Sequence, residues 1–354
     1  FNDDGSLRFH TVRWIQDGRW EGGMLGDLIT VNGTVHPRAN VARGTYRFRT
    51  LNASNYRPYI LSFSNGTKFW VIGNDSGLLD QPVYVTAATI NPGERIDIIA
   101  DFTGLGPGDT VDLMNSYEFE PGIGEVSGAQ TIKNLIRFIG TGTTGFTGTP
   151  PDTLRGGPRQ APALPVIPTA NRRRIITLSL SPAMSWPPFT ENLNNLCYHD
   201  EPIPDPKQGT TEIWEFVNVS PESHPMHLHL VHMRILNRQS LDFLGYVAAN
   251  PPPPVGTYWA PEPDRFLNGP LQPPGAWETG AKDTVTCPAF TVTRVAITFP
   301  TADQLGFDPD ATFSVGGMAG MTGMGETMAQ GYVWHCHLID HEDECMMSRL
   351  RLHA

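Results

Sequence analysis

Six of the eleven histidines in this chain of 354 residues lie in two short clusters. The first cluster runs from His224 to His229 and reads HPMHLH, and the second runs from His335 to His341 and reads HCHLIDH. Met346 follows the second cluster. Neither spacing is that of a zinc finger, and the pair His337 and His341 lacks the adjacent glutamate of a metalloprotease helix. Imidazole, thiol and thioether groups at this density indicate a metal site of another kind.

Side chains alternate between the two faces of a β-strand, so two histidines that flank one residue share a face. This alternation predicts a group of four imidazoles on one side of the two clusters: His227, His229, His335 and His337. Imidazole is a good ligand for copper. Four imidazoles together suit a copper centre that binds and reduces dioxygen.

The opposite face gathers softer donors. Cys336 points away from the four imidazoles, and His224 has the strand parity to join it, with His341 and Met346 further along the chain. Two imidazoles and one thiolate in a trigonal plane, with a distant thioether, form a type 1 (blue) copper site that passes single electrons. The covalent bonds from Cys336 to its two histidine neighbours would link this site to the other. The alternative is a zinc site or a chance cluster of core residues. It is disfavoured, because all these side chains would then have to fall at compatible spacing by accident.

The composition favours many short strands and turns over a helical bundle, because the chain has 36 glycines and 32 prolines. Charged residues make up 17% of the chain, which is too few for a disordered protein. No apolar run reaches the roughly 18 residues of a membrane span. Lys and Arg number 25 against 36 Asp and Glu, and the one basic stripe is Arg172–Arg174, so we do not expect nucleic-acid binding.

Three regions follow one another along the chain. Residues 1–140 read as β, with Arg95–Phe102 as a short apolar strand before a Gly/Pro turn. Residues 141–170 are rich in Gly, Thr and Pro and lack periodicity, which is typical of a linker. A second β region follows over residues 171–354. The chain is therefore predicted to be all-β, with two β-sandwich domains joined by a linker.

At the two histidine clusters the sequence resembles the multicopper oxidases, particularly the branch of the spore-coat laccase, phenoxazinone synthase and bilirubin oxidase. The stretches that also resemble the family are Ile29–Gly33, Tyr46–Ser54, Glu94–Ile98 and Gly209–Trp214. The resemblance covers most of the chain and implies cupredoxin-like Greek-key sandwiches. It also implies one-electron oxidation of a small donor, coupled to four-electron reduction of O2 to water.

The resemblance assigns a role to each candidate residue. It implies four ligands of the type 1 copper: His224, Cys336, His341 and Met346. His227 matches a ligand of the type 2 copper, and three residues match ligands of the binuclear type 3 copper: His229, His335 and His337. A complete enzyme of this family holds four coppers. Glu342 matches an acid that helps deliver protons, so the catalytic residues expected are Cys336, His341 and Glu342.

The sequence departs from the family pattern in one respect. Family members have three domains, and the first domain supplies two further His-x-His pairs, which bring the imidazoles around the trinuclear cluster to eight. Nothing in residues 1–223 resembles such a pair, and the first strand of the leading sandwich is expected to be missing. We therefore expect domains two and three, with domain one in a separate chain or a missing segment. The alternative is a blue-copper electron-transfer or copper-binding module without oxidase activity.

Other features leave alternatives open. The donor could be a phenol, an aminophenol, bilirubin, Cu(I) or Mn(II), because the family builds its donor pocket largely from loops. Four methionines could bind Cu(I) or fill a Gly-rich loop: Met318, Met321, Met324 and Met328. Cys197 and Cys287 could form a disulfide or stay as buried thiols, and Cys345 is expected to pack. The cellular location is left open, with a secreted or extracytoplasmic protein as the favoured case.

Overall fold

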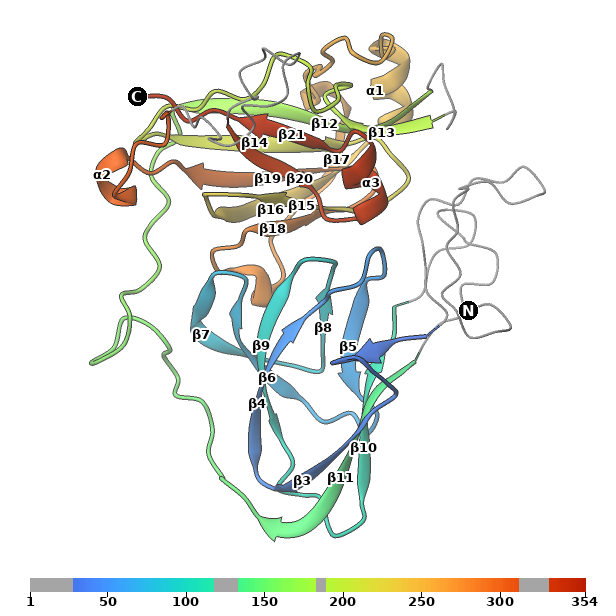
Figure 1. Ribbon diagram of the computed structural model, residues 1–354, viewed down its shortest axis with the longest axis vertical. Coiled ribbons are helices and arrows are strands. Elements are labelled where there is room, and N and C mark those ends of the chain that lie inside the picture. The colour runs from blue at the N-terminus through green and yellow to red at the C-terminus, as the bar shows by residue number, and fades with distance from the viewer. Residues whose placement is uncertain (1–27, 118–132, 183–188, 312–330) are drawn as a thin grey trace, which may run out of the picture.

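The computed structural model describes residues 28–117, 133–182, 189–311 and 331–354. Within these ranges the chain is mostly β, which confirms the predicted all-β fold class. Two groups of sheets lie one above the other in Figure 1, with the strands from β1 to β11 (blue to green) below and the strands from β12 to β21 (green to red) above. We call them the N-terminal and the C-terminal sandwich. No helix in the described ranges is both long and apolar enough to cross a membrane.

The N-terminal sandwich consists of two sheets and a small hairpin. The five-stranded sheet has the order β3 (Arg38–Arg43), β11 (Asn134–Thr144), β10 (Thr110–Asn115), β5 (Tyr59–Phe63) and β8 (Ala87–Ile90). The four-stranded sheet has the order β4 (Thr45–Leu51), β9 (Arg95–Asp101), β6 (Phe69–Asn74) and β7 (Gly77–Val85), and the hairpin is β1 (Thr30–Val31) with β2 (Thr34–Val35). Alternation along β9 buries Ile96, Ile98 and Ala100 in the core between the sheets. The strand expected at Arg95–Phe102 is therefore present.

The C-terminal sandwich consists of a six-stranded and a four-stranded sheet. The six-stranded sheet has the order β13 (Phe189–Leu193), β12 (Arg172–Pro182), β14 (Thr211–Asn218), β19 (Thr291–Thr298), β16 (Met233–Leu241) and β17 (Leu267–Gln272). The four-stranded sheet has the order β18 (Thr284–Cys287), β15 (His224–Leu228), β20 (Tyr332–Cys336) and β21 (Met347–Leu350). The helices are α1 (Phe243–Ala249), α2 (Ala302–Leu305) and α3 (Ile339–Glu344), with 3-10 turns η1 (Asp264–Phe266) and η2 (Ala276–Glu278).

A pair of buried tryptophans joins the two sheets of the C-terminal sandwich. Trp214 of β14 and Trp334 of β20 meet edge to face, with ring centroids 5.5 Å apart. Both indole N–H groups are satisfied, because Trp214 donates to Glu212 and Trp334 donates to the Arg349 carbonyl. The strand that carries Cys336 therefore rests on a packed and fully hydrogen-bonded core.

The two histidine clusters meet because β15 and β20 are antiparallel neighbours in the centre of the four-stranded sheet. The register places His227 opposite His335 and Met226 opposite Cys336. Two segments more than a hundred residues apart in the sequence thereby become adjacent.

The connection between the sandwiches differs in detail from the expected linker. β11 continues through Thr144 and so includes the first four residues of the expected linker, because it pairs in parallel with β3 up to Arg43. No strand is assigned between β11 and β12, and Leu154 on this segment is buried in the N-terminal core. The methionine loop lies outside the described residues, within residues 312–330. The expectation of a missing first strand is not tested, because residues 1–27 also lie outside the described residues.

Candidate metal centre

Three fully buried side chains converge on one point between β15, β20 and α3. The Cys336 Sγ atom lies 3.6 Å from Nδ1 of His224 and 3.9 Å from Nδ1 of His341. The two Nδ1 atoms are 3.2 Å apart. Sulfur and two imidazole nitrogens thus form a compact triangle that is closed to water. We call it the thiolate group.

The other ring nitrogen of each histidine in the thiolate group is held from outside. Nε2 of His224 lies 2.6 Å from the Ser220 hydroxyl, and Nε2 of His341 lies 3.2 Å from a carboxylate oxygen of Glu222. With both Nε2 atoms engaged, both Nδ1 atoms face the sulfur. The cysteine sulfur, two nitrogen donors that face it and burial away from solvent match the soft donor set of a type 1 copper.

The electrostatics of the thiolate group favour a bound cation. Burial lowers the pKa of His224 well below its usual value, and His341 adds to the effect. Burial would also lower the pKa of His341, but Glu191 and Glu222 outweigh it and raise that pKa. The pKa of the Cys336 thiol is raised by burial. A metal cation at the centre of the triangle would stabilise the thiolate that burial disfavours.

Met346 is brought to the thiolate group by backbone hydrogen bonds. The Cys336 N–H donates to the Met346 carbonyl, and the Met346 N–H donates to the His341 carbonyl, each at 2.9 Å. The Met346 side chain is fully buried in the same core cluster as Cys336. The turn after α3 therefore returns the thioether to the neighbourhood of the sulfur.

Four imidazoles gather on the opposite side of β15 and β20, and we call them the imidazole group: His227, His229, His335 and His337. The ligand atoms of the first three lie within 4.8 Å of one another. The His337 ring centroid lies 5.7 Å from those of His227 and His335. His229 is exposed on the surface of this chain.

Hydrogen bonds select the ring nitrogen that each imidazole offers. Nδ1 of His227 lies 3.1 Å from the Asp283 carbonyl and 3.0 Å from the Thr284 hydroxyl. Nδ1 of His335 lies 3.0 Å from the Cys336 carbonyl. Both rings therefore keep Nε2 for a metal. Nδ1 of His337 is buried without a hydrogen-bond partner among the described residues, and such an orphaned donor fits a metal ligand.

Three members of the imidazole group have lowered pKa values, which favours their neutral form. Burial lowers the pKa of His335 to about 4, and it is also the main cause of lowered pKa values at His229 and His337. Neutral imidazole is the form that binds metals. Both donor groups therefore fit copper by their chemistry.

Comparisons with known proteins agree with this chemistry. Residues 168–307 match the family model described as multicopper oxidase. A laccase of Bacillus subtilis is 34% identical over 326 residues, which cover 91% of this chain and 53% of the laccase. The multicopper oxidase LPR1 of Arabidopsis thaliana is 30% identical over 338 residues, which cover 94% of this chain and 54% of that protein. The chain belongs to the multicopper oxidase family. It spans about half the length of these curated relatives.

Solved structures of multicopper oxidases share the fold. The laccase-like CueO of Ochrobactrum sp. superposes with a TM-score of 0.63 at 24% identity and covers 93% of this chain and 60% of its own. McoA of Aquifex aeolicus superposes with a TM-score of 0.61 at 25% identity, covering 96% of this chain and 64% of its own. The predicted cupredoxin-like architecture is thereby confirmed.

Glu342 lies beside the imidazole group of this multicopper oxidase chain, although its sequence neighbour His341 belongs to the thiolate group. Its carboxylate oxygen Oε2 is 3.2 Å from Nδ1 of His335. Burial, together with the carboxylate of Asp343, raises the pKa of Glu342. One turn of α3 therefore reaches both donor groups.

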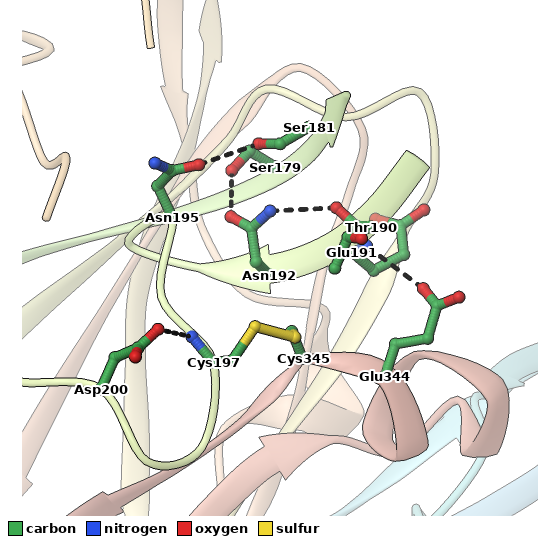
Figure 2. The surroundings of a disulfide bond; sticks show 10 residues. All are labelled: Ser179, Ser181, Thr190, Glu191, Asn192, Asn195, Cys197, Asp200, Glu344 and Cys345. Atoms are coloured by element: carbon green, nitrogen blue, oxygen red, sulfur yellow. Dashed lines mark hydrogen bonds between the residues drawn. A yellow bond between two sulfur atoms is a disulfide. The ribbon is translucent and has the colours of Figure 1, made fainter. Parts of the chain in front are cut away.

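The disulfide differs from the expected one. Cys197 pairs with Cys345, whereas Cys287 is a buried free thiol, so the suggested Cys197–Cys287 bond is wrong and so is the expectation that Cys345 only packs. Cys287 lies in β18 opposite His224, away from the loop of Cys197. Figure 2 shows the loop after β13 beside the end of α3, where the disulfide joins them. The Glu191 N–H also donates to the Glu344 side chain at 3.3 Å.

Sequence reasoning missed the side chains that hold the ligands. Ser220 and Glu222 precede His224 by a few residues, and their proximity was the available signal. Asp283 and Thr284 lie far from every histidine in the sequence, and only the pairing of β15 with β18 brings them to His227. Tyr56 of the N-terminal sandwich, whose ring centroid is 5.9 Å from that of His341, carried no signal at all.

Removal of the disulfide should destabilise the C-terminal sandwich. The bond closes a loop with a sequence separation of 148 residues, and loss of a disulfide typically costs about 2–5 kcal/mol of folding free energy. We expect Cys197→Ser combined with Cys345→Ser to lower the urea midpoint of unfolding. A reductant should lower the midpoint of the unaltered protein and leave the double variant unchanged. A peptide map of unreduced protein that joins Cys197 to Cys287 would contradict the pairing.

Proposed function

We propose that this chain is the part of a multicopper oxidase that carries the type 1 copper and half of a trinuclear copper cluster. The whole enzyme would couple one-electron oxidation of a phenolic, aminophenolic or similar donor, or of a metal ion, to reduction of O2 to water. The observation that carries the proposal is the pair of donor groups on opposite sides of β15 and β20. The family comparisons favour this oxidase over an electron-transfer or copper-binding module without oxidase activity.

Each residue of the thiolate group has a distinct task in the proposed type 1 site. His224, Cys336 and His341 would hold the copper, and Met346 would add a weak thioether donor. Bound copper would supply the one-electron chemistry. The buried walls exclude water, so the donors keep one geometry during electron transfer. Ser220 and Glu222 hold the two rings at Nε2, which fixes their orientation.

Cys336 would also connect the two sites. It is covalently bonded through the backbone to His335 and His337, which face the opposite side of the strand. An electron that arrives at the thiolate therefore has a path of bonds to the imidazole group. No diffusing carrier is needed between the two sites.

Replacement of the thiolate tests the type 1 site, and the chain offers a matched control. Cys336 and Cys287 are both free and fully buried. We expect Cys336→Ser to abolish the intense thiolate-to-copper absorption and the oxidase activity, because a hydroxyl is a poor ligand for soft copper. Cys287→Ser should keep both. A Cys336→Ser protein that stays blue would refute the assignment of the thiolate.

Glu342 is proposed as a proton donor to the site of O2 reduction. Reduction of O2 to two waters consumes four protons, and the carboxylate lies within reach of the imidazole group through His335. The competing role is to orient His335 alone. Glutamine distinguishes the two roles, because its amide oxygen can still accept a hydrogen bond from Nδ1 but cannot carry a proton.

We expect Glu342→Gln to slow reoxidation of the reduced enzyme by O2 about 100-fold or more, the usual size of a general-acid contribution. Reduction of the type 1 site by the donor should keep its rate. Asp303→Asn, at an exposed carboxylate of α2, is the control and should change neither rate. Stopped-flow absorbance measures both steps. If Glu342→Gln reoxidises as fast as the unaltered enzyme, the proton role is wrong.

We also propose that another part of the enzyme completes the imidazole group. The described residues offer four imidazoles, and His229 is exposed, so the group lies at the surface of this chain. The proposed layout is a sandwich without copper ligands over residues 1–140, a linker over 141–170 and the copper-carrying sandwich over 171–354. A further cupredoxin domain, in the same or another polypeptide, would bring two His-x-His pairs against His229.

The composition of the active enzyme tests this completion. Intact mass and denaturing electrophoresis of a fully copper-loaded preparation should show more protein than these 354 residues. The addition should be a longer polypeptide or a second one of roughly 100–200 residues, the usual size of a domain. Four coppers with O2 consumption support the oxidase, and one copper without turnover supports the module. An active four-copper preparation of this chain alone would contradict the proposed partner domain.

A further inference from the structure

Two turns of the N-terminal sandwich touch the segment that holds His227. One turn, Asn91–Arg95, connects β8 to β9, and the other contains Asp75 and connects β6 to β7. The segment they meet is Gly280–Thr284, which leads into β18 of the C-terminal sandwich. In Figure 1 the contact lies where the lower sandwich meets the upper one, beneath β18.

Arg95 makes a two-pronged ion pair across this contact. Its guanidinium nitrogens donate to the two carboxylate oxygens of Asp283 at 2.7 and 2.5 Å. The guanidinium is itself held from the N-terminal side, because it also donates to the Asp75 carbonyl at 3.0 Å. Such parallel bonds fix both the distance and the orientation of a carboxylate. Asp283 is therefore positioned by a side chain from the other sandwich.

Asp283 in turn determines how His227 is held. The Thr284 hydroxyl donates to the Asp283 carboxylate at 2.9 Å, so its oxygen is left to accept from Nδ1 of His227 at 3.0 Å. The Asp283 carbonyl lies 3.1 Å from the same Nδ1, and the carboxylate lies 3.5 Å away. Every neighbour of this nitrogen is thus an acceptor. The proton stays on Nδ1, and Nε2 keeps its lone pair towards the imidazole group.

A buried lysine sets the register of the segment. The Lys282 ammonium lies 2.8 Å from Asp75 and 3.3 Å from Glu94, and the side chains of all three are nearly inaccessible to water. Breaking a buried ion pair is strongly destabilising, so these charges resist a shift of one sandwich against the other. The backbone of Lys282 is also paired in both directions with Met233 of β16.

Gly93 brings the same turn onto a second imidazole. A Cβ atom at Gly93 would lie 2.2 Å from Cδ2 of His337, and the residue has a φ of +80°. Only glycine fits this close approach and this backbone conformation. The turn Asn91–Arg95 therefore contacts the imidazole group directly at His337 and indirectly at His227.

We propose that the N-terminal sandwich positions the imidazole group, and that Arg95 is a positioning residue that acts through Asp283 on His227. The inference rests on the proposed function, because it treats Nε2 of His227 as a copper ligand. It assigns a task to the sandwich that itself contributes none of the proposed ligands.

Copper retention in the whole copper-loaded enzyme tests this proposal. Loss of a residue that orients a metal-bound histidine typically lowers metal affinity 10- to 100-fold. We expect the type 2 copper of Arg95→Gln to be removed at a chelator concentration lower by that factor. The electron paramagnetic resonance signal of the type 2 copper measures how much of it remains. The blue absorption of the type 1 copper should persist, because Arg95 donates to Gly93, Asp75 and Asp283, which do not belong to the thiolate group. Arg95→Lys keeps the charge without the two parallel bonds and should lose less.

Arg137→Gln is the matched control. Arg137 forms the same two-pronged pair with Asp112, at 2.7 and 2.9 Å, within the N-terminal sandwich and away from the imidazole group. It should retain type 2 copper like the unaltered enzyme. Retention by Arg95→Gln equal to that of the control would overturn the proposal, as would equal loss of both copper types, which indicates general destabilisation. Should Arg95→Gln fail to fold, Arg95→Lys and Asp283→Asn carry the same test.

A double variant tests whether Arg95 acts through Asp283. If it does, Arg95→Gln should change copper retention less than about threefold once Asp283→Asn is present, because coupled residues are not additive. If the effects of the two substitutions on copper retention multiply, Arg95 does not act through Asp283. Failure of the proposed function has a different signature, since the unaltered enzyme would then lack the type 2 signal. If the unaltered enzyme shows the type 2 signal and the Arg95 and Asp283 variants retain copper equally well, this inference is wrong and the proposed function stands.

Discussion

The antiparallel pairing of β15 with β20 is the constraint on which both donor groups depend. It places Met226 opposite Cys336 and His227 opposite His335. Because side chains alternate, one register sends a cysteine to one side and histidines to the other. A shift by one residue would exchange the faces and separate both groups at once. The packing of Trp334 against Trp214 behind the strand opposes such a shift.

Strand pairing alone does not complete the thiolate group, which also needs residues beyond the end of β20. The chain leaves the strand after Cys336, forms the short helix α3 and returns along β21. Helix α3 carries His341, and the return carries Met346. The hydrogen bond from the Cys336 N–H to the Met346 carbonyl closes this loop. The disulfide at Cys345 anchors its far side to the loop after β13, so the segment has few ways to move.

Much of the candidate site could be predicted because its logic is local. Parity within a strand needs only the sequence, so the division of Cys336 from the four imidazoles followed from alternation alone. The disulfide was not predictable, because the sequence does not show which two of three cysteines come together in the fold: Cys197, Cys287 and Cys345. The contact between Asp283 and Arg95 spans a separation of 188 residues and arises from the docking of two sandwiches. No local pattern encodes such a contact.

The docking surface beside the imidazole group is ionic where an apolar one would be less costly. Taking Lys282, Asp75 and Glu94 out of water carries a large desolvation penalty, which their mutual attraction offsets only in a good geometry. An apolar surface tolerates sliding, whereas charges with fixed partners accept one arrangement. This specificity matters most where small displacements change function. A ring nitrogen that binds metal must be held within about half an ångström of its position. On the proposed reading, the ionic contact transfers the rigidity of the N-terminal sandwich to His227, and the two sandwiches act as one unit.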